Sequence, residues 1–394
     1  MRLRWIPVLA VSLLAAGATP AAAGPGRPSH TGGAHPRSAF AASAHERPAR
    51  PAFAAAAHER PDRPAPAHRR PAWRLSETGV TARLRGLSAV SARVAWASGS
   101  GGTVLRTVDG GATWRQVGPA GAADLQLRDI EAFDARRAVT LSIGEGEQSR
   151  IYRTADGGRT WRETFRNDDP RAFYDCLAFF DDRHGIALSD PVDGAFRVLS
   201  TADGGLSWRV LPNTGMPPAL AGEFAFAASG TCLVTAPHHR RAAWFATGGG
   251  ATARVFRTTD RGRTWSVVDS PVPSGPTAGI YSLAFRDSRH GVAVGGDYTT
   301  PASAPGAVAV TRTGGRGWVA APHPPGEYRS AAAWLPGTRR TVVAVGPTGS
   351  DVSYDGGRRW HRFDTGSFDA VDCAGRWACW ASGEAGRVAV LRRR

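Results

Sequence analysis

Thr107-Val108-Asp109-Gly110-Gly111-Ala112-Thr113-Trp114 is the first of six copies of one short phrase in this 394-residue chain. The later copies, three clean and two degraded, begin at Thr154, Thr201, Thr258, Thr311 and Ser353. The pattern S/T-x-D-x-G-x-T-W, which we call a box, is typical of a tight β-hairpin. Its Asp can accept hydrogen bonds from backbone N–H groups of the same turn, its Gly residues supply positive φ, and its Trp opens the next strand.

Turn chemistry accounts for every Asp and Trp of the boxes, so we expect them to be structural and to lie on the outer rim. The fifth box has Thr313 in place of Asp, so its hairpin must rely on its glycines and neighbours. The residues given this structural role are Asp109, Trp114, Asp156, Trp161, Asp203, Trp208, Asp260, Trp265, Asp355 and Trp360.

The spacing of the boxes predicts the architecture. Successive turn positions are 47, 47, 57, 53 and 42 residues apart, close to the ~40–50 residues of a four-stranded propeller blade. A second phrase, a short apolar run such as Val94–Ala97 or Gly291–Val294, occurs seven times. The seventh unit ends at Arg387–Leu391 without a box, and Trp73–Leu75 resembles the segment that follows a box Trp. We therefore predict an all-β, seven-bladed β-propeller of four-stranded blades whose ring is closed by the N-terminal strand.

Three regions follow one another along the chain. Residues 1–23 have the basic start, apolar stretch and Ala-rich end of a signal peptide. Residues 24–72, rich in Pro, Ala, Arg and His, are too poor in apolar residues to form a core, so we expect a disordered tether. Residues 73–394 form the predicted propeller. We expect a secreted or extracytoplasmic monomer without a transmembrane segment, because the leader's apolar run is shorter than the ~20 residues of a spanning helix.

Four cysteines are expected to pair in an exported protein. Cys373 and Cys379 flank a turn-like link between adjacent strands, so we predict a disulfide between them. Cys176 and Cys232 remain, but four cysteines allow three connectivities and the sequence does not choose among them.

The net charge of +16 comes entirely from Arg, because the chain has no Lys. Part of this charge belongs to residues 24–72, which carry eight Arg against three acidic residues. Elsewhere the Arg residues are scattered and no nucleic-acid motif is present, so we expect no nucleic-acid partner. The four cysteines have no Cys-x-x-Cys spacing, so we expect no metal, and no cofactor motif is present.

The start of the innermost strand in each blade is the candidate site, because these strands line a propeller's central channel. Large polar residues stand there where a buried strand would favour Val or Ile. We predict partner-binding roles, with ion pairing among the same residues as the alternative, for Arg85, Arg128, Asp129, Asp175, Glu223 and Arg329. A second polar cluster, Ser189–Gly194, is explained by turn chemistry, and a cation held there with Asp175 is the alternative.

Over residues 73–394 the chain resembles the WD40/YVTN/BNR-like, or Asp-box, repeat propellers, and among them the photosystem II stability/assembly factor-like proteins. The boxes with a preceding Arg, as in Arg106–Gly111, and the phrases Asp182–Ala187 and Asp287–Ala293 carry this resemblance. It implies an assembly module that acts through an Arg-lined surface. The alternating Arg and carboxylate residues of the channel mouth suit a charged protein or glycan partner, so we predict a non-catalytic binding or assembly module. The client of the photosynthetic relatives does not carry over, since nothing here points to photosynthesis.

Two enzymatic alternatives remain. Sialidases share the boxes, but their Phe-Arg-Ile-Pro phrase is absent, and Leu84–Leu87 stands nearest to it. If the chain is a secreted glycoside hydrolase, Asp175, Glu223 and Tyr281 are the candidate catalytic residues. Some bacterial members of the group are labelled oxidoreductases, although this chain has no dinucleotide, haem or flavin motif. We predict no catalytic residues, and a protein or glycan partner of unknown identity.

Overall fold

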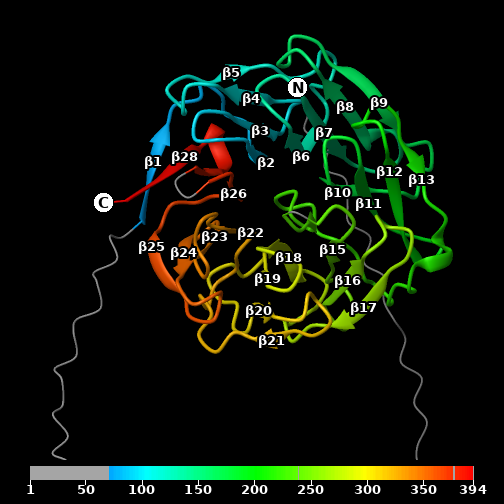
Figure 1. Cartoon of the computed structure of the whole chain (residues 1–394), viewed down its shortest axis with the longest axis vertical. Helices are drawn as coiled ribbons and strands as arrows, with labels where there is room; N and C mark the ends of the chain where they lie inside the picture. Colours follow the sequence, from blue (N-terminus) through cyan, green and yellow to red (C-terminus); the bar gives the residue numbers. More distant parts are fainter. Residues whose placement is uncertain (1–70, 238, 376–377, 394) are drawn as a thin grey trace, which may run out of the picture. The chain divides into compact units, whose positions relative to one another are not determined.

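A computed structural model describes residues 71–237, 239–375 and 378–393. The expected signal peptide, residues 1–23, and almost all of the expected tether, residues 24–72, lie outside the described residues. Within them the chain forms seven antiparallel sheets of four strands each. The sheets follow one another around a ring, with the innermost strands at its centre (Figure 1). The prediction of an all-β, seven-bladed propeller is confirmed, and no helix among the described residues is long and apolar enough to cross a membrane.

Blades one to four are consecutive along the chain. Blade one consists of β2 (Leu84–Ala89), β3 (Ala95–Gly99), β4 (Val104–Thr107) and β5 (Arg115–Gln116). Blade two consists of β6 (Gln126–Ala132), β7 (Ala138–Ile143), β8 (Arg150–Thr154) and β9 (Arg162–Arg166). Blade three consists of β10 (Tyr174–Phe179), β11 (Gly185–Val192), β12 (Ala195–Thr201) and β13 (Arg209–Val210). Blade four consists of β14 (Leu233–Thr235), β15 (Ala243–Ala246), β16 (Arg254–Thr258) and β17 (Ser266–Asp269).

Blades five and six complete the consecutive part. Blade five consists of β18 (Ala278–Phe285), β19 (Gly291–Asp297), β20 (Val308–Thr311) and β21 (Val319–Ala320). Blade six consists of β22 (Ala331–Trp334), β23 (Val342–Gly346), β24 (Gly349–Ser353) and β25 (His361–Asp364). Short 3₁₀ turns lie at η1 (Gly146–Gln148), η2 (Asn213–Gly215) and η3 (Glu384–Gly386).

Blade seven joins the two ends of the described chain. Its inner strands are β26 (Ala370–Cys373), β27 (Cys379–Ser382) and β28 (Val388–Arg393), and its outer strand is β1 (Pro71–Ser76). β1 pairs antiparallel with β28, with Trp73 opposite Leu391 (Figure 1). The indole of Trp73 packs between Phe363 and Phe368 and donates a hydrogen bond of 2.9 Å to the Ser350 hydroxyl. The predicted closure by the N-terminal strand is therefore present, and β1 begins two residues before Trp73.

The boxes form the turns between the third and outer strands of blades one to six. In the first, the Asp109 carboxylate accepts hydrogen bonds from the Thr107 hydroxyl at 2.8 Å and from the Thr113 amide and hydroxyl at 2.9 and 2.6 Å. The same three bonds recur at Asp156, Asp203 and Asp260. In the fifth box the Thr311 hydroxyl still accepts the Gly315 amide at 3.1 Å, which preserves the turn without the Asp.

Each box also docks on the preceding blade. Gly111 has a φ of +80°, and a Cβ there would lie 3.0 Å from the ring of Trp380 in blade seven. The box Trp114 meets the same ring edge to face, at 5.7 Å between centroids. Both the left-handed backbone and the close approach require glycine at this position. Because Gly111 and Trp114 contact Trp380, the box also joins blade one to blade seven.

We expect ring closure to be the least replaceable feature of the fold. Deleting residues 24–70 should leave Tm within a degree or two, because the sequence predicts no core-forming segment there. Extending the deletion through Ser76 removes the outer strand of blade seven and the Trp73 contacts, and should lower Tm by more than about 5 °C. Differential scanning calorimetry of both truncations measures this. A similar Tm for the two proteins would contradict the proposed importance of β1.

Candidate functional site

A cavity of about 560 Å³ opens at the end of the channel where the innermost strands begin. Every blade contributes to it, so the site depends on the complete ring. Its charged lining consists of Arg83, Arg85, Arg128, Asp175, Asp190 and Asp369, and its aromatic lining of Phe173, Phe224, Phe226, Tyr281, Tyr298 and Tyr328. We call this cavity the channel-mouth site.

Four lining residues occupy β-bulges in the innermost strands. In blade one, Leu84 pairs with Gly99 and Gly86 with Ser98, which leaves Arg85 as the extra residue without a partner. The same shift leaves Arg128, Asp175 and Tyr281 unpaired in β6, β10 and β18. A bulge turns an additional side chain out of the regular alternation, and bulges are common beside binding sites. This repeated irregularity is what directs these four side chains into the mouth.

The three arginines of the site are satisfied to different degrees. Arg83 holds Asp369 through two hydrogen bonds, at 2.9 and 2.7 Å. Arg85 lies farther from the same carboxylate, at 3.7 Å from Nε to Oδ1. Arg128 bonds only the Ala227 carbonyl, at 2.8 Å. Burial, together with the positive charges of Arg85 and Arg83, lowers the pKa of Arg128 to about 10. Arg85 and Arg128 therefore form a pair of poorly neutralised cations.

Two carboxyl groups face these cations across the mouth. Burial, reinforced by the neighbouring Asp190, raises the pKa of Asp175 well above its usual value. Burial likewise raises the pKa of Asp190 to about 7, although its Oδ1 accepts the Ala225 amide at 2.8 Å. Oδ2 of Asp175 is buried without a hydrogen-bond partner. Near neutral pH the two carboxyls together therefore carry less negative charge than two ordinary aspartates would.

Aromatic rings line the opposite part of the site. Phe226 and Tyr281 stack with centroids 3.8 Å apart, and Tyr328 meets Tyr281 edge to face at 4.8 Å. Tyr298 is 54 % exposed at the entrance. The Tyr281 hydroxyl donates to the Thr277 carbonyl at 2.7 Å, and burial raises its pKa above the usual range. The rings thus form a rigid surface suited to stacking and apolar contact.

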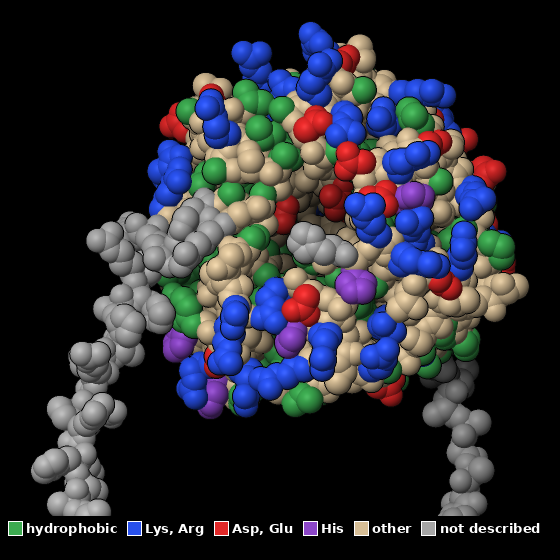
Figure 2. Space-filling model, in the orientation of Figure 1, with side chains coloured by type: hydrophobic (Ala, Val, Ile, Leu, Met, Phe, Trp, Pro, Cys, Tyr) green, Lys and Arg blue, Asp and Glu red, His purple; other side chains and the backbone are tan. Residues whose placement is uncertain are grey.

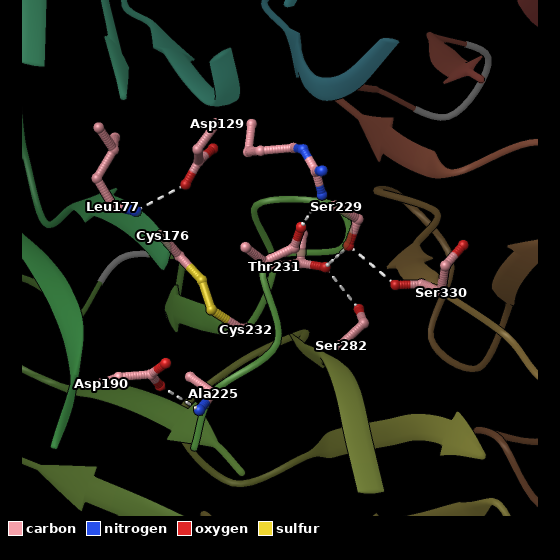
Figure 3. Close-up of a disulfide and its surroundings, with 12 residues drawn as sticks. Asp129, Cys176, Leu177, Asp190, Ala225, Ser229, Thr231, Cys232, Ser282 and Ser330 are labelled. Carbon is pink, nitrogen blue, oxygen red and sulfur yellow. Dashed lines mark hydrogen bonds between the residues drawn. A yellow bond between two sulfur atoms is a disulfide. The ribbon is translucent and has the colours of Figure 1, made fainter. Parts of the chain in front are cut away.

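In blade four the innermost strand, β14, has only three residues, and the preceding segment, residues 224–231, contributes part of the cavity wall. A disulfide between Cys176 of β10 and Cys232 anchors this segment to blade three (Figure 3). Further along it, the Thr231 hydroxyl bonds Ser282 at 2.7 Å and the Ser229 hydroxyl bonds the Ser330 carbonyl at 2.9 Å. The wall is therefore tied to blades three, five and six. The second disulfide joins Cys373 to Cys379, as the sequence predicts.

Of the six residues predicted to bind a partner, Arg85, Arg128 and Asp175 line the cavity, as does Tyr281. The other three lie outside its lining. The buried carboxylate of Asp129 accepts the Leu177 amide at 2.7 Å. Glu223 is paired with Arg254 and accepts the Thr247 hydroxyl at 2.6 Å.

Arg329, the sixth, is fully buried and paired with Asp351. Its Nη1 also donates to the Thr348 hydroxyl at 2.9 Å. Glu223 and Arg329 are therefore ion-paired, each with a residue outside the predicted set.

Sequence reasoning missed Arg83, Phe224, Phe226 and Tyr298. Arg83 lies two residues before Arg85, and this spacing places both on one side of a strand, which was an available signal. The two phenylalanines belong to a segment without strand periodicity, and Tyr298 lies on the β19–β20 connection. No pattern in the chain marks those three. The described residues contain no group of three or more His, Cys, Asp or Glu arranged to hold a metal ion.

No family model and no curated protein matches the chain. Solved structures share its fold at 14 % sequence identity. YCF48 bound to D1 peptide has a TM-score of 0.56 over 82 % of this chain and 96 % of that one. YCF48 from Cyanidioschyzon merolae reaches 0.57 at 14 % identity, over 82 % and 99 %. The WD40 domain of Neurospora crassa Pan2 reaches 0.53 at 14 % identity, over 79 % and 89 %. The sequence-based resemblance to assembly factor-like and WD40 propellers is confirmed for the fold.

From the raised pKa values of the buried carboxyls we predict that the protein becomes less stable as the pH rises from 5 to 8.5. Burial raises the pKa of Asp129 to about 8 and that of Asp190 to about 7, against about 3.9 in an unfolded chain. The folded state binds these protons more tightly, so their contribution is complete below about pH 4 and is lost as the pH rises through 7 and 8. We expect Tm to fall between pH 5 and pH 8.5.

Asp129→Asn keeps an oxygen for the Leu177 amide and removes the ionisation. This variant should therefore lose less Tm over the same range, while the exposed Asp124→Asn should behave as the unmodified protein does. Thermal melts in a constant-ionic-strength buffer series measure the difference. A Tm that rises from pH 5 to pH 8.5 would show that these carboxyls are ionised in the fold.

Proposed function

We propose that this protein is an exported, non-catalytic binding or assembly module whose channel-mouth site takes an acidic segment of a partner protein. The observation that carries the proposal is the pair Arg85 and Arg128, partly buried at the mouth without a close carboxylate of their own. The expected signal peptide and the two disulfides support export.

An acidic group fits this position on electrostatic grounds. Asp369 is already held by Arg83, burial favours the protonated form of Asp175, and Asp190, with a pKa of about 7, is only partly ionised near neutral pH. A carboxylate between the two guanidinium groups would gain charge-assisted hydrogen bonds in a partly desolvated site, where such bonds are strong. The partner's carboxylate would thus supply the charge that the protein lacks.

The aromatic wall favours a peptide over a glycan of purely polar character. Phe226, Tyr281 and Tyr328 are fixed against one another, so they can contact an apolar side chain without a large loss of conformational freedom. A solved relative in fold, YCF48, is described with a bound D1 peptide. That precedent supports a peptide partner here and does not identify it.

A hydrolase is the second candidate, favoured by one observation. Asp175 and Asp190 are neighbouring carboxyls with raised pKa, a property that general acids share. The remaining hydrolase candidates fit less well. Glu223 is engaged by Arg254 away from the cavity, and the Tyr281 hydroxyl donates to a carbonyl and resists ionisation. A nucleophile activated by a base is therefore missing from the described lining.

Fluorescence polarisation with labelled 12-residue peptides tests the binding role. Peptides that place one Asp or Glu beside an aromatic residue should bind better than the same peptides carrying Asn or Gln. The double variant Arg85→Gln/Arg128→Gln should weaken this binding about tenfold or more, since it removes two charge-assisted contacts. The exposed pair Arg115→Gln/Arg162→Gln removes the same charge and should change it less than about twofold.

Equal binding of acidic and amide peptides, or equal loss in both double variants, would reject the channel-mouth role. A panel of aryl glycosides examines the hydrolase in parallel. Turnover that disappears in Asp190→Asn, with Tm unchanged, would replace the binding function by an enzymatic one.

A further inference from the structure

A second cavity, of about 300 Å³, lies between blades five and six, outside the channel-mouth site. Four turns enclose it: the β18–β19 and β22–β23 connections and the boxes of blades five and six. Its lining contains five arginines and one acidic residue: Arg286, Arg312, Arg339, Arg340, Arg358 and Asp355. We call it the rim pocket. On the face shown in Figure 2, Arg side chains gather along the rim over the sector of these two blades.

Among these arginines Arg286 has an ion pair, and the charge of Arg358 acts on the Asp355 carboxylate. Arg286 is paired with Asp287 at 3.0 Å and lies over the ring of Trp334, with its guanidinium carbon 5.3 Å from the ring centroid. The Asp355 carboxylate is occupied by its own box turn, where it accepts the amides of Arg358 and Arg359 at 3.1 and 2.9 Å. In the part of the chain that the structure describes, the side chains of Arg312, Arg339, Arg340 and Arg358 form no ion pair or hydrogen bond.

The rim pocket differs from the corresponding pocket between blades three and four in the number of its arginines, which is five against three. Between blades three and four the corresponding pocket is smaller, about 120 Å³. There Arg261 is held by the Arg240 carbonyl at 2.9 Å and by Asp181 at 3.7 Å. Between blades two and three, Arg137 is paired with Asp134 and Asp182. The box beside the rim pocket has Thr313 where most others have Asp, so one carboxylate is missing there.

Four exposed guanidinium groups without an ion pair in the described chain surround one cavity that has a single acidic residue, and a bound anion would offset their excess positive charge. Guanidinium forks match the oxygens of tetrahedral phosphate and sulfate, to which they donate two parallel hydrogen bonds. The pocket has room for more than one such group, and Trp334 provides a flat wall beside them. A ligand with several of these groups would also contact arginines of all four turns.

We propose that the rim pocket binds an oligo-anion carrying phosphate or sulfate groups, such as an inorganic oligophosphate or a sulfated sugar chain. This site is independent of the channel mouth and of its proposed partner. The arginines of the two box turns and of the β22–β23 connection hold the anion, and Arg286 fixes Trp334 at its side.

Isothermal titration calorimetry of the full chain at 150 mM NaCl tests the proposal, with tripolyphosphate and a sulfated hexasaccharide as probes. At least one probe should bind with a stoichiometry of one. Arg339→Gln/Arg340→Gln/Arg358→Gln should weaken it about tenfold or more. The matched control, Arg93→Gln/Arg115→Gln/Arg162→Gln, removes three exposed charges elsewhere and should weaken it less than about twofold. Arg85→Gln/Arg128→Gln should leave it unchanged.

Tighter binding of tripolyphosphate assigns the pocket to phosphate, and tighter binding of the hexasaccharide assigns it to sulfate. Equal losses in both triple variants, many weak sites, or equally tight binding of hexaglutamate would reject the proposal in favour of general attraction to a basic surface. Phenylglyoxal labelling of the unmodified protein gives the same answer without variants. The bound probe should slow the modification of Arg340 and Arg358 but not of Arg115, and equal rates would count against the pocket.

Discussion

Pairing of β1 with β28 is the constraint on which the rest of this molecule depends. Each blade covers one face of the next, so an open ring would expose the faces of two sheets and one strand edge to solvent. The C-terminal part supplies only three strands of blade seven, and six residues from the start of the described chain complete it. The channel-mouth cavity needs all seven blades, so closure of the ring is also what assembles the site.

The channel-mouth site and the rim pocket both have excess positive charge, but the excess has a different origin in each. At the mouth, burial suppresses the ionisation of Asp175 and Asp190, and Arg83 occupies Asp369, so the cations there are left in excess by proton binding and pairing. At the rim the excess arises because arginines on four turns converge where few carboxylates stand. Both are positive sites, but the mouth is lined by six aromatic residues, whereas the rim pocket has the indole of Trp334.

The fold was predictable because the boxes carry local chemistry that a sequence displays directly: Asp109 and Thr113 lie within one turn. The site was predictable only in part. The predicted starts of the innermost strands located the mouth. The alternation of side chains along β6 could not decide whether Arg128 or Asp129 points into it, because the bulge at Arg128 arises from pairing with β7. The partner of Arg329 is Asp351, 22 positions away on another strand, and nothing in the sequence links them. Long-range ion pairs and bulges arise from tertiary contact, which local patterns do not encode.

The bulges at Arg85, Arg128, Asp175 and Tyr281 have a consequence for how such a protein diverges. A side chain without a cross-strand partner can be exchanged without disturbing a ladder pair, so the cost of substitution falls on recognition and not on folding. A lineage built on this plan can change the charge of its mouth at Arg85 and Arg128, whereas Asp175 and Tyr281 are also held by Asp190 and Phe226. The charge of the channel mouth can then change while the seven-bladed fold is kept, even between sequences that are no longer recognisably alike.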